Sequence, residues 1–413
     1  MKHDVNSSFG KMSWQDLVSN IEPNNFCLLI EDSDNYTLMW GEEDRFDYYS
    51  DKNNWSEIQN FIDKHERNHI WTNLNYDLKN EIDSSLKSNN TKYAHFPEAC
   101  FIVPKHVLLC RSGKISTSSD LSSFRKRFEI KEKLIPLELS PIQSEQEYIH
   151  QLELLLAEIQ FGNIYEINYC TAFVNNNCQL EPLQSFNKLV GLTQAPHSVF
   201  MKIDSNYLLC GSPERYIRKT GNILQSQPIK GTARRSQNEK EDIQIKYDLK
   251  NDPKEISENI MIVDLVRNDL SKVASKNTVR VKHLNELHTF KSVHQLISTI
   301  ECRLSKGASF SDIISATFPM GSMTGAPKKS AMQLSEKHEE FSRNLYSGSV
   351  GLIQPNGDFD LNVVIRSALY NDQENQLMIG VGGAITALSD PKKEYQECLI
   401  KLKAVKESLC SRN

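Results

Sequence analysis

Several features that mark common protein classes are missing from this 413-residue sequence. No apolar run approaches the roughly 20 residues that a membrane-spanning helix needs, and the first ten residues, MKHDVNSSFG, contain no apolar signal core. Dense runs of basic residues are also missing, and the net charge is −5, which argues against nucleic acid as a partner. We therefore expect no membrane association, no secretion and no binding to nucleic acid.

Cysteine is present, but its spacing fits no known framework. The nine cysteines are scattered from Cys27 to Cys410 without a C-x-x-C pair, which argues against a zinc site and against disulfides. With 39% hydrophobic and 24% charged residues, the chain can bury a sizeable core. The sequence therefore predicts a globular protein of the reducing cytoplasm.

Strand-like and helix-like segments occur in separate blocks, which favours an α+β fold over a doubly wound sheet. A capping box at Ser144 and Glu147 opens an amphipathic helix that Gly162 ends. Other helices are predicted at 253–270, 290–303, 309–316, 325–339 and 391–408, and strands at 26–30, 99–104, 164–174, 198–204, 207–213, 215–228, 346–354, 359–370 and 376–385. A change of pattern near residue 140 divides the chain into regions 1–140 and 141–413.

Two predicted helices carry paired glutamates, Glu255 with Glu258 and Glu394 with Glu397. Residues three apart share a helical face, so each pair directs two carboxylates the same way. If the two faces meet, four carboxylates converge, and a cation is needed to make that tolerable. Oxygen ligands of this kind suit Mg²⁺. Two solvated helix faces would have the same spacing, so the pattern leaves both readings open.

The glycine-rich stretch FPMGSMTGAPK (318–328) is not a phosphate-binding loop. Its glycines are four apart and a proline precedes Lys328, so it does not match G-x-x-x-x-G-K-[ST], and we do not expect ATP binding. A helix that opens here would still offer free N–H groups to a carboxylate. In IGVGGAIT (379–386), the adjacent Gly382 and Gly383 either let the backbone approach a ligand or mark a bulge.

Four polar side chains stand out singly. Arg366, in the strand-like VVIRS, either clamps a carboxylate or pairs with a buried acid. His294, in a predicted helix, fits a structural histidine. Lys230, in QPIKGTARR, lies at a predicted turn, where a lysine is usually solvated. Glu214 precedes Lys230 by sixteen residues, and a short connection between successive strands would bring the two close.

The region after about residue 140 resembles the chorismate-utilising enzymes: anthranilate synthase component I, aminodeoxychorismate synthase component I, isochorismate synthase and salicylate synthase. The matching stretches follow the family's order and are GSPERYI (211–217), QPIKGTARR (227–235), ENIMIVDLVRNDLSKVA (258–274), HTFKSVHQLISTI (288–300), ATFPMGSMTGAPKKSAM (316–332), YSGSVGLI (346–353), VVIRSALY (363–370), VGGAITALSDP (381–391) and EYQE (394–397). The resemblance implies that family's chorismate-binding fold, a two-layer β core with helices outside, to which the divergent region 1–140 contributes.

The resemblance also assigns roles by position. Glu258 and Glu397 match the Mg²⁺ ligands, with Glu255 and Glu394 in support, and Glu214 matches the general acid that helps the C4 hydroxyl of chorismate to leave. The substrate's carboxylates are expected to be held by Arg366, Thr324 and the backbone of Gly382 and Gly383, and the matching motifs that contain His294 and Lys328 imply supporting roles for both.

The residue type at the position of Lys230 distinguishes members of the family from one another. In anthranilate and isochorismate synthases, the P-I-x-G-T motif typically carries a small residue at x, and the lysine form resembles aminodeoxychorismate synthase of the p-aminobenzoate and folate branch. There the lysine is the proposed nucleophile: it attacks C2 as hydroxide leaves C4, and ammonia then adds at C4 and expels it, giving 4-amino-4-deoxychorismate. Because the attack needs a neutral amine, we expect burial and Mg²⁺ to lower the pKa of Lys230.

The sequence departs from the family at several points. Isochorismate and salicylate formers carry a water-activating lysine where this chain has Glu166, which argues against hydroxylation at C2 and leaves the role of Glu166 open. The stretch NLNYDLKNE (73–81) lacks the glycine of the family's G-Y-D segment. CLLIED (27–32) only distantly resembles the L-L-E-S motif of tryptophan-inhibited anthranilate synthases, so feedback by tryptophan is not expected.

The chain contains no cysteine in a nucleophile context such as G-x-C-x-G. Ammonia is therefore expected either from a separate glutamine amidotransferase subunit or from solution. Two alternatives stay open. An anthranilate synthase component I is disfavoured, because Lys230 would fill the space through which ammonia reaches C2. A catalytically idle subunit that only recruits an amidotransferase is disfavoured as well, because it would need neither Lys230 and Glu214 nor the paired glutamates.

Overall fold

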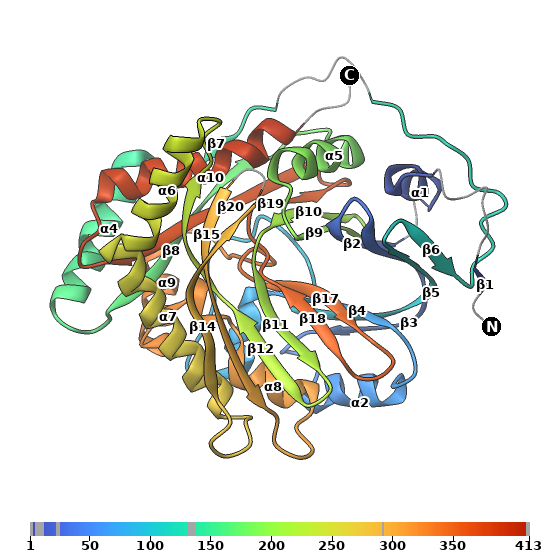
Figure 1. Ribbon diagram of the computed structural model, residues 1–413, viewed down its shortest axis with the longest axis horizontal. Coiled ribbons are helices and arrows are strands. Elements are labelled where there is room, and N and C mark those ends of the chain that lie inside the picture. Colours follow the sequence, from blue (N-terminus) through green and yellow to red (C-terminus); the bar gives the residue numbers. More distant parts are fainter. Residues whose placement is uncertain (1–2, 5–11, 22–24, 131–136, 291–292, 410–413) are drawn as a thin grey trace.

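The computed structural model describes residues 3–4, 12–21, 25–130, 137–290 and 293–409 (Figure 1). Its helices are α1 (Trp14–Ile21), α2 (Ser56–Lys64), α3 (Lys79–Ile82), α4 (Glu145–Gln160), α5 (Pro182–Thr193), α6 (Glu239–Asn251), α7 (Pro253–Ser271), α8 (Phe310–Thr317), α9 (Lys328–His338) and α10 (Pro391–Ser408), with 3₁₀ turns η1 (Tyr76–Leu78) and η2 (Gly321–Met323). Its strands are β1 (His3–Asp4), β2 (Phe26–Asp32), β3 (Asn35–Tyr48), β4 (Ile70–Leu74), β5 (Ala99–Arg111), β6 (Lys114–Thr117), β7 (Ser140–Pro141), β8 (Glu166–Asn175), β9 (His197–Ile203), β10 (Asn206–Ser212), β11 (Arg215–Thr220), β12 (Ile223–Gln227), β13 (Ile229–Arg234), β14 (Arg280–Thr289), β15 (Val293–Arg303), β16 (Gly325–Ala326), β17 (Ser349–Ile353), β18 (Phe359–Asn362), β19 (Ser367–Asn371) and β20 (Gln376–Thr386).

The strands form one large antiparallel sheet, which confirms the predicted α+β class. From one end, the pairing runs β8, β20, β19, β10, β9, β2, β3, β5, β4, β17, β18, β11, β12 and β15, and both β13 and β14 pair with β15. Strands β2 to β5, from the first 140 residues, lie in the middle of this path. The boundary near residue 140 therefore does not separate two sheets, and the division of the chain at that point stays a proposal.

Two hydrophobic clusters lie on opposite faces of the strands. In β2, Phe26 and Leu28 belong to one cluster and Cys27 to the other, because successive strand residues point to opposite faces. The cluster that contains Cys27 also contains Cys170 of β8 and Ile300 of β15, so the sheet folds back on itself around it. Helices α4, α5 and α10 cover the other cluster from outside (Figure 1). The expected two-layer β core with outer helices is confirmed.

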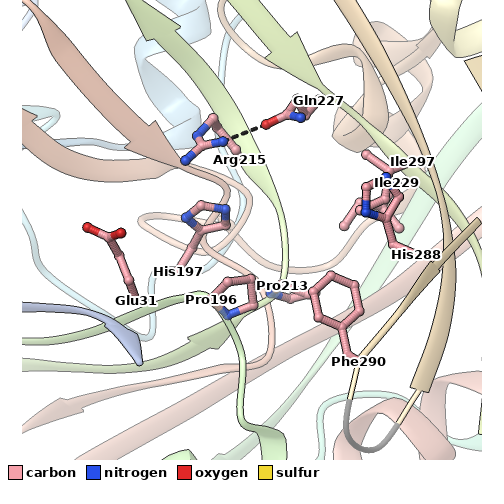
Figure 2. A pocket seen from close by; sticks show the side chains of 10 residues that line it. All are labelled: Glu31, Pro196, His197, Pro213, Arg215, Gln227, Ile229, His288, Phe290 and Ile297. Carbon is pink, nitrogen blue, oxygen red and sulfur yellow. Dashed lines mark hydrogen bonds between the residues drawn. The ribbon is translucent and has the colours of Figure 1, made fainter. Parts of the chain in front are cut away.

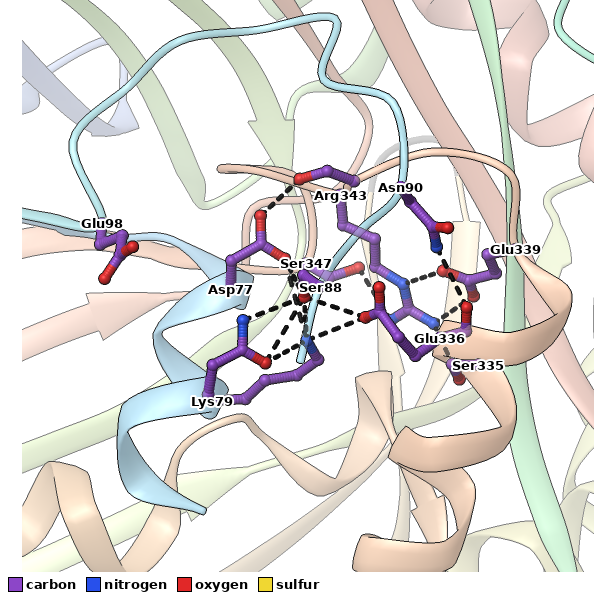
Figure 3. Close-up of polar contacts among 12 residues, drawn as sticks. Asp77, Lys79, Ser88, Asn90, Glu98, Ser335, Glu336, Glu339, Arg343 and Ser347 are labelled. Atoms are coloured by element: carbon purple, nitrogen blue, oxygen red, sulfur yellow. Dashed lines mark hydrogen bonds and ion pairs between the residues drawn. The ribbon is translucent and has the colours of Figure 1, made fainter. Parts of the chain in front are cut away.

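A buried polar network ties the N-terminal region to the segment after α9 (Figure 3). The Lys79 ammonium donates to Ser88 (2.7 Å) and to Glu336 of α9 (3.1 Å). The Arg343 guanidinium, 1% exposed, pairs with Glu339 and also donates to the backbone oxygen of Asn168 in β8 (2.8 Å). Buried charges are tolerated when they are paired and hydrogen-bonded in this way. The network holds β8 and the N-terminal region in a fixed relation.

The predicted helices around α4, α7 and α10 are confirmed, including the capping box at Ser144. The helix predicted near 290–303 is wrong: Val293–Arg303 form β15. This strand is buried along almost its whole length, so it lacks the polar and apolar alternation that separates a strand from a buried helix. The strand predicted at 359–370 is interrupted, because Arg366 adopts φ +51° between β18 and β19.

Two further sequence expectations concern the whole chain. The cysteines among the described residues are all buried and form no disulfide, as their scattered spacing predicts. Among the described residues, no helix is both long and apolar enough to cross a bilayer.

Candidate active site

Helices α7 and α10 begin in the same way, with an aspartate that caps the helix and a proline in the first turn. The Asp252 side chain accepts from the backbone N–H groups of Lys254 and Glu255. Asp390 does the same for Lys393 in α10. Each cap satisfies N–H groups that have no partner within the helix, and each proline suits the first helical position. The paired glutamates therefore stand in the opening turns of two well-anchored helices.

The two glutamate-bearing faces meet through Lys254. Its ammonium lies 3.1 Å from Glu394 Oε1 of α10 and 3.7 Å from Glu258 Oε1 of its own helix. Glu397 forms an ion pair with Lys401 (2.7 Å), and Lys401 also donates to the backbone oxygen of Gly382 (2.8 Å). As they stand, the described residues contain no group of three or more acidic, histidine or cysteine side chains arranged to hold a metal ion. Lys254 supplies the positive charge between the two faces.

The side chain of Glu258 tests whether these residues fit a cation. Glu258 is 6% exposed, and burial raises the pKa of its carboxyl to about 7, against the opposing charges of Lys230 and Lys254. Its Oε1 atom is buried and accepts no hydrogen bond from the described residues. A buried carboxylate oxygen with no donor, beside further carboxylates, is what a hard cation requires. The residues present therefore fit Mg²⁺, provided that Lys254 moves aside.

Lys230 and Glu166 form a buried ion pair. The Lys230 ammonium donates to Glu166 Oε1 at 2.8 Å, and the side chains are 10% and 1% exposed. Burial opposes the charged amine, but the carboxylates of Glu166, Glu258 and Glu214 outweigh it and raise the pKa of Lys230. The direction is opposite to the lowering that the sequence suggested, because sequence reasoning did not pair Lys230 with Glu166. For the Mg²⁺-loaded protein, the lowering stays a prediction.

The predicted turn at Lys230 is wrong, since the residue lies in β13. The pairing of β13 with β15 shifts between Ile229 and Thr232, and Gly231 adopts φ +85° at this irregularity. A β-bulge of this kind re-aims the adjacent side chain, and glycine tolerates the positive φ. An added Cβ at Gly231 would lie 3.2 Å from Glu255 Oε2. The bulge therefore brings Lys230 to the opening turn of α7.

Glu214 occupies the connection between β10 and β11. It is 5% exposed, and its backbone oxygen accepts from Val363 N (3.0 Å). Burial raises the pKa of its carboxyl to about 7, although hydrogen bonds from Ser322 and the backbone of Ile229, and the charge of Lys230, oppose the shift. The sequence predicts that Glu214 and Lys230 lie close together, and the effect of the Lys230 charge on the pKa of Glu214 is consistent with that prediction. Near neutral pH, Glu214 can exchange a proton.

Arg366 and the glycine pair flank the carboxylates. The Arg366 guanidinium has no ion-pair partner within 4 Å among the described residues, and attraction to Glu397 only partly offsets the lowering of its pKa by burial. An added Cβ at Gly383 would lie 3.5 Å from Glu394 Oε2, whereas at Gly382 it would lie 2.5 Å from the Tyr169 carbonyl oxygen. Both glycines continue the β20–β8 ladder in register, so they do not mark a bulge. Gly383 is the one that faces the carboxylates.

Three other predicted site residues make internal contacts. The Thr324 hydroxyl, fully buried, donates to the backbone oxygens of Met320 and Gly321 (both 3.2 Å), and its own carbonyl accepts from Asn168 N at the start of β8. Lys328 pairs with Asp269 near the far end of α7 (2.6 Å), and His294, in β15 rather than a helix, contacts Asp242 (2.8 Å). These contacts place Lys328 in an ion pair and His294 in a hydrogen bond of the scaffold, and their supporting roles stay predictions.

A pocket of about 220 Å³ is lined by residues that neighbour Lys230 and Glu214 in the chain (Figure 2). It is lined by Glu31, Pro196, His197, Pro213, Arg215, Gln227, Ile229, His288, Phe290 and Ile297. Ile229 precedes Lys230 in β13, and Pro213 and Arg215 flank Glu214 in the chain. None of the four glutamates of α7 and α10 lines this pocket, and the CLLIED stretch contributes Glu31 to it.

Comparisons with known proteins show the family of this chain. The family model described as chorismate binding enzyme matches residues 24–407, almost the whole chain. The chain belongs to this family. It is 41% identical over 265 residues to the probable chloroplastic aminodeoxychorismate synthase of Oryza sativa subsp. japonica, a match that covers 63% of this chain and 29% of that protein. The chain thus spans less than a third of that relative's length.

Two further relatives complete the comparison. Anthranilate synthase component 1 of Saccharolobus solfataricus is 32% identical over 316 residues, which covers 76% of this chain and 74% of that protein. The solved structure of the menaquinone-specific isochorismate synthase of Escherichia coli matches with a TM-score of 0.80 at 19% identity, and covers 99% of this chain and 93% of that one. At that identity, the structural match shows the shared fold.

Sequence reasoning missed two lysines of this family member's site. Lys254 and Lys401 stand four residues from Glu258 and Glu397, a spacing at which opposite charges meet on a helix, so the signal was present. The spacing alone did not distinguish Lys254 and Lys401 from the many other lysines as residues of the site. The partner of Glu166 had no sequence signal, because β8 and β13 are not neighbours in the sheet.

Proposed function

We propose that the protein aminates chorismate at C4 and retains the enolpyruvyl group, as an aminodeoxychorismate synthase component I. The observation that carries the proposal is Lys230, buried beside Glu166 and within electrostatic reach of Glu214. A lysine at this place puts a nucleophile in the site, whereas a small residue would leave room for ammonia to reach C2 directly.

Each site residue then has a role. Lys230 is the nucleophile at C2, and Glu214 gives its proton to the hydroxyl that departs from C4. The raised pKa of Glu214, about 7, keeps a useful fraction of this acid protonated at neutral pH. Arg366, Thr324 and the backbone at Gly382 and Gly383 hold the substrate's carboxylates, and Arg366 is suited to this because the described residues offer it no ion-pair partner.

The four glutamates of α7 and α10 are the proposed Mg²⁺ site, with Glu258 and Glu397 as ligands and Glu255 and Glu394 in support. When bound, Mg²⁺ would neutralise carboxylate charge on the protein and on the substrate. A cation at Glu258 would also remove one of the negative charges that raise the pKa of Lys230. The proposal therefore retains the expectation that the loaded site makes the Lys230 amine easier to deprotonate.

Ammonia is proposed to come from a separate glutamine amidotransferase subunit. The Saccharolobus relative is named component 1, which indicates a further component in that enzyme. We place the protein in the cytoplasm on the same sequence grounds as before.

A product assay tests the proposal. The purified protein would be incubated with chorismate, Mg²⁺ and ammonium, the products resolved by mass, and free pyruvate measured. An aminated product that keeps its enolpyruvyl group, without pyruvate, is the expected result. Anthranilate with pyruvate would instead establish the second candidate, anthranilate synthase, which the match over 76% of the chain favours. No consumption of chorismate would leave only the recruiting subunit.

A further inference from the structure

We propose that Glu166 takes the proton that Lys230 must lose before it attacks, and that it positions the amine for that attack. The inference rests on the proposed function. It starts from the 2.8 Å contact between Lys230 Nζ and Glu166 Oε1, the one hydrogen bond that the Lys230 ammonium makes among the described residues. A nucleophile with a base in hydrogen-bond contact is the arrangement that activates weak nucleophiles.

The position of Glu166 suits a fixed base. It is the first residue of β8, and its backbone is paired on both sides, with Ala326 of β16 and with Thr386 of β20. Gly325 packs so closely against it that an added Cβ there would lie 2.2 Å from the Glu166 carbonyl oxygen. The main chain at Glu166 therefore has little freedom, and its carboxylate is delivered from a rigid element to the amine.

One oxygen of Glu166 is unused. Oε1 accepts from Lys230, whereas Oε2 is buried and has no hydrogen-bond partner among the described residues. A buried carboxylate oxygen without a donor is costly, and protonation of the carboxyl removes that cost. Glu166 thus keeps one oxygen free of other partners in the described part of the chain while its second oxygen contacts the amine.

Two other carboxylates face Lys230, and each has another task. Glu258, from α7, belongs to the proposed Mg²⁺ site. Glu214, from the β10–β11 connection, is the proposed acid for the C4 hydroxyl and must hold its own proton until that hydroxyl leaves. Neither makes a hydrogen bond to the Lys230 ammonium. This leaves Glu166 as the acceptor.

The resulting steps balance. The Lys230 ammonium gives one proton to Glu166, and the neutral amine uses its lone pair to form the N–C2 bond. The ring double bonds shift, the C4–O bond breaks, and Glu214 gives its proton to the departing hydroxyl, which leaves as water. Ammonia then forms the N–C4 bond, the double bonds shift back, and the C2–N bond to lysine breaks. Glu166 returns its proton to the free Lys230 amine, and the C4 ammonium gives one proton to the Glu214 carboxylate, which restores the acid for the next turnover.

A base role for Glu166 also explains why this chain has a glutamate at position 166, where the family resemblance leads us to expect a lysine in isochorismate and salicylate formers. Where isochorismate and salicylate formers are expected to carry a lysine that activates water, a carboxylate is engaged with Lys230 instead. The nucleophile then stands on β13 and its base on β8. Water has no activating amine of its own, so the pair directs attack on C2 to the protein's lysine.

The test compares the wild-type protein with Glu166→Gln, Glu166→Asp and the control Glu301→Gln. Glu301 is another buried carboxylate in an ion pair, with Arg280 of β14, and it stands outside the site. Each protein is assayed with chorismate and Mg²⁺ between pH 6.5 and 9.5 at a constant concentration of free ammonia. Loss of a general base typically lowers kcat by about 10²–10⁴-fold. We expect a loss of about 100-fold for Glu166→Gln at pH 7, with KM for chorismate unchanged.

The pH profile separates this role from a structural one. In Glu166→Gln the deficit should shrink as the pH rises, because hydroxide replaces the missing base, and Glu166→Asp should recover part of the activity. If Glu166 only holds the amine charged, its removal makes the neutral amine more abundant, and kcat would stay equal or increase. That result, or a loss that is the same at every pH, would overturn the inference.

A second measurement tests the role of Glu166 independently of the proposed function. Lys230 is labelled with an amine-specific reagent over a pH series, without substrate, and quantified by peptide mass. In Glu166→Gln, half-maximal labelling should move to lower pH; an unchanged midpoint would show that the pair does not form and would reject the inference. The product made by the wild-type protein decides the proposed function independently.

Discussion

Lys230 Nζ lies 2.8 Å from Glu166 Oε1, although the two residues stand on strands at opposite ends of the pairing path. No backbone pairing joins β8 and β13 in the described residues. The contact is therefore made by side chains across the place where the rolled sheet returns to its beginning. The opening turns of α7 and α10 meet at the same place.

The energy of this pair can be measured with a double-mutant cycle. Removing one partner of a buried ion pair costs about 3–5 kcal/mol, because the other charge is left uncompensated. We expect Lys230→Met and Glu166→Gln to lower the free energy of unfolding, and the double variant to lose less than the sum. Urea denaturation measures this, and the exposed pair Arg267–Asp264 provides the control, with a coupling of about 0.2–1 kcal/mol or less. Additive losses at Lys230 and Glu166 would contradict the prediction.

Glu214 should make both stability and activity depend on pH. Its pKa in the folded protein, about 7, lies above the ordinary value of 4.5, so the folded state binds the proton more tightly. Its effect on stability is therefore favourable at low pH and is lost as the pH rises from about 4.5 through 7. We expect Glu214→Gln to raise the thermal midpoint at pH 8 but not at pH 4.5. A midpoint difference that does not vary with pH would exclude the shift.

The same substitution should remove the acid for the C4 hydroxyl. The expected loss in kcat is about 10²–10⁴-fold, the usual effect of losing a general acid. In the wild-type protein, activity at constant free ammonia should fall as the pH rises through about 7, and this limb should be absent from Glu214→Gln.

Lys254 should compete with Mg²⁺. Its ammonium lies between Glu394 and Glu258, so a cation has to displace it before both carboxylates can bind. We expect Lys254→Gln to bind Mg²⁺ about tenfold more tightly, a change of about 1.4 kcal/mol, in calorimetry without substrate. The exposed Lys392 provides a matched control, because Lys392→Gln removes the same charge nearby. Equal affinities in the two variants would show that Lys254 does not occupy the cation's place.

The two neighbouring glycines should behave differently. Gly382→Ala would place Cβ 2.5 Å from the Tyr169 carbonyl oxygen, so the β8–β20 pairing has to shift and stability should fall. Gly383→Ala meets Glu394 Oε2 at an ordinary 3.5 Å, so the protein should fold with an unchanged thermal midpoint. If the backbone at Gly383 approaches the substrate, KM for chorismate should increase in this variant. Unaltered KM would remove Gly383 from the site.

Most of the helices and strands could be predicted from the sequence, because their boundaries depend on local patterns such as caps and hydrophobic periodicity. The capping box at Ser144 and the helices predicted at 253–270 and 391–408 depend on local sequence patterns, and the structure bears them out. The prediction failed at β15, a strand buried on both faces, and at Lys230, where proline and glycine mark a bulge and not a turn. Both errors come from pairing with distant strands, which no local pattern records.

The candidate site could be predicted as a set of residues but not as a set of contacts. The spacing of the glutamates showed that each pair shares a face, and their meeting is visible in the Lys254 bridge. The contacts of Lys328 with Asp269 and of His294 with Asp242 had no sequence signal, because each joins elements far apart in the chain. These contacts depend on how the sheet rolls, which is a property of the whole chain.

The way in which Lys230 and Glu166 meet has a consequence for the divergence of related sequences. Because only side chains join β13 to β8 here, either residue can be exchanged without breaking a row of backbone hydrogen bonds. A change at one position alone leaves a buried charge unmatched, and selection would act against that intermediate. We therefore expect the two positions to covary among descendants of a common ancestor, so that new chemistry arises from paired substitutions on an unchanged scaffold.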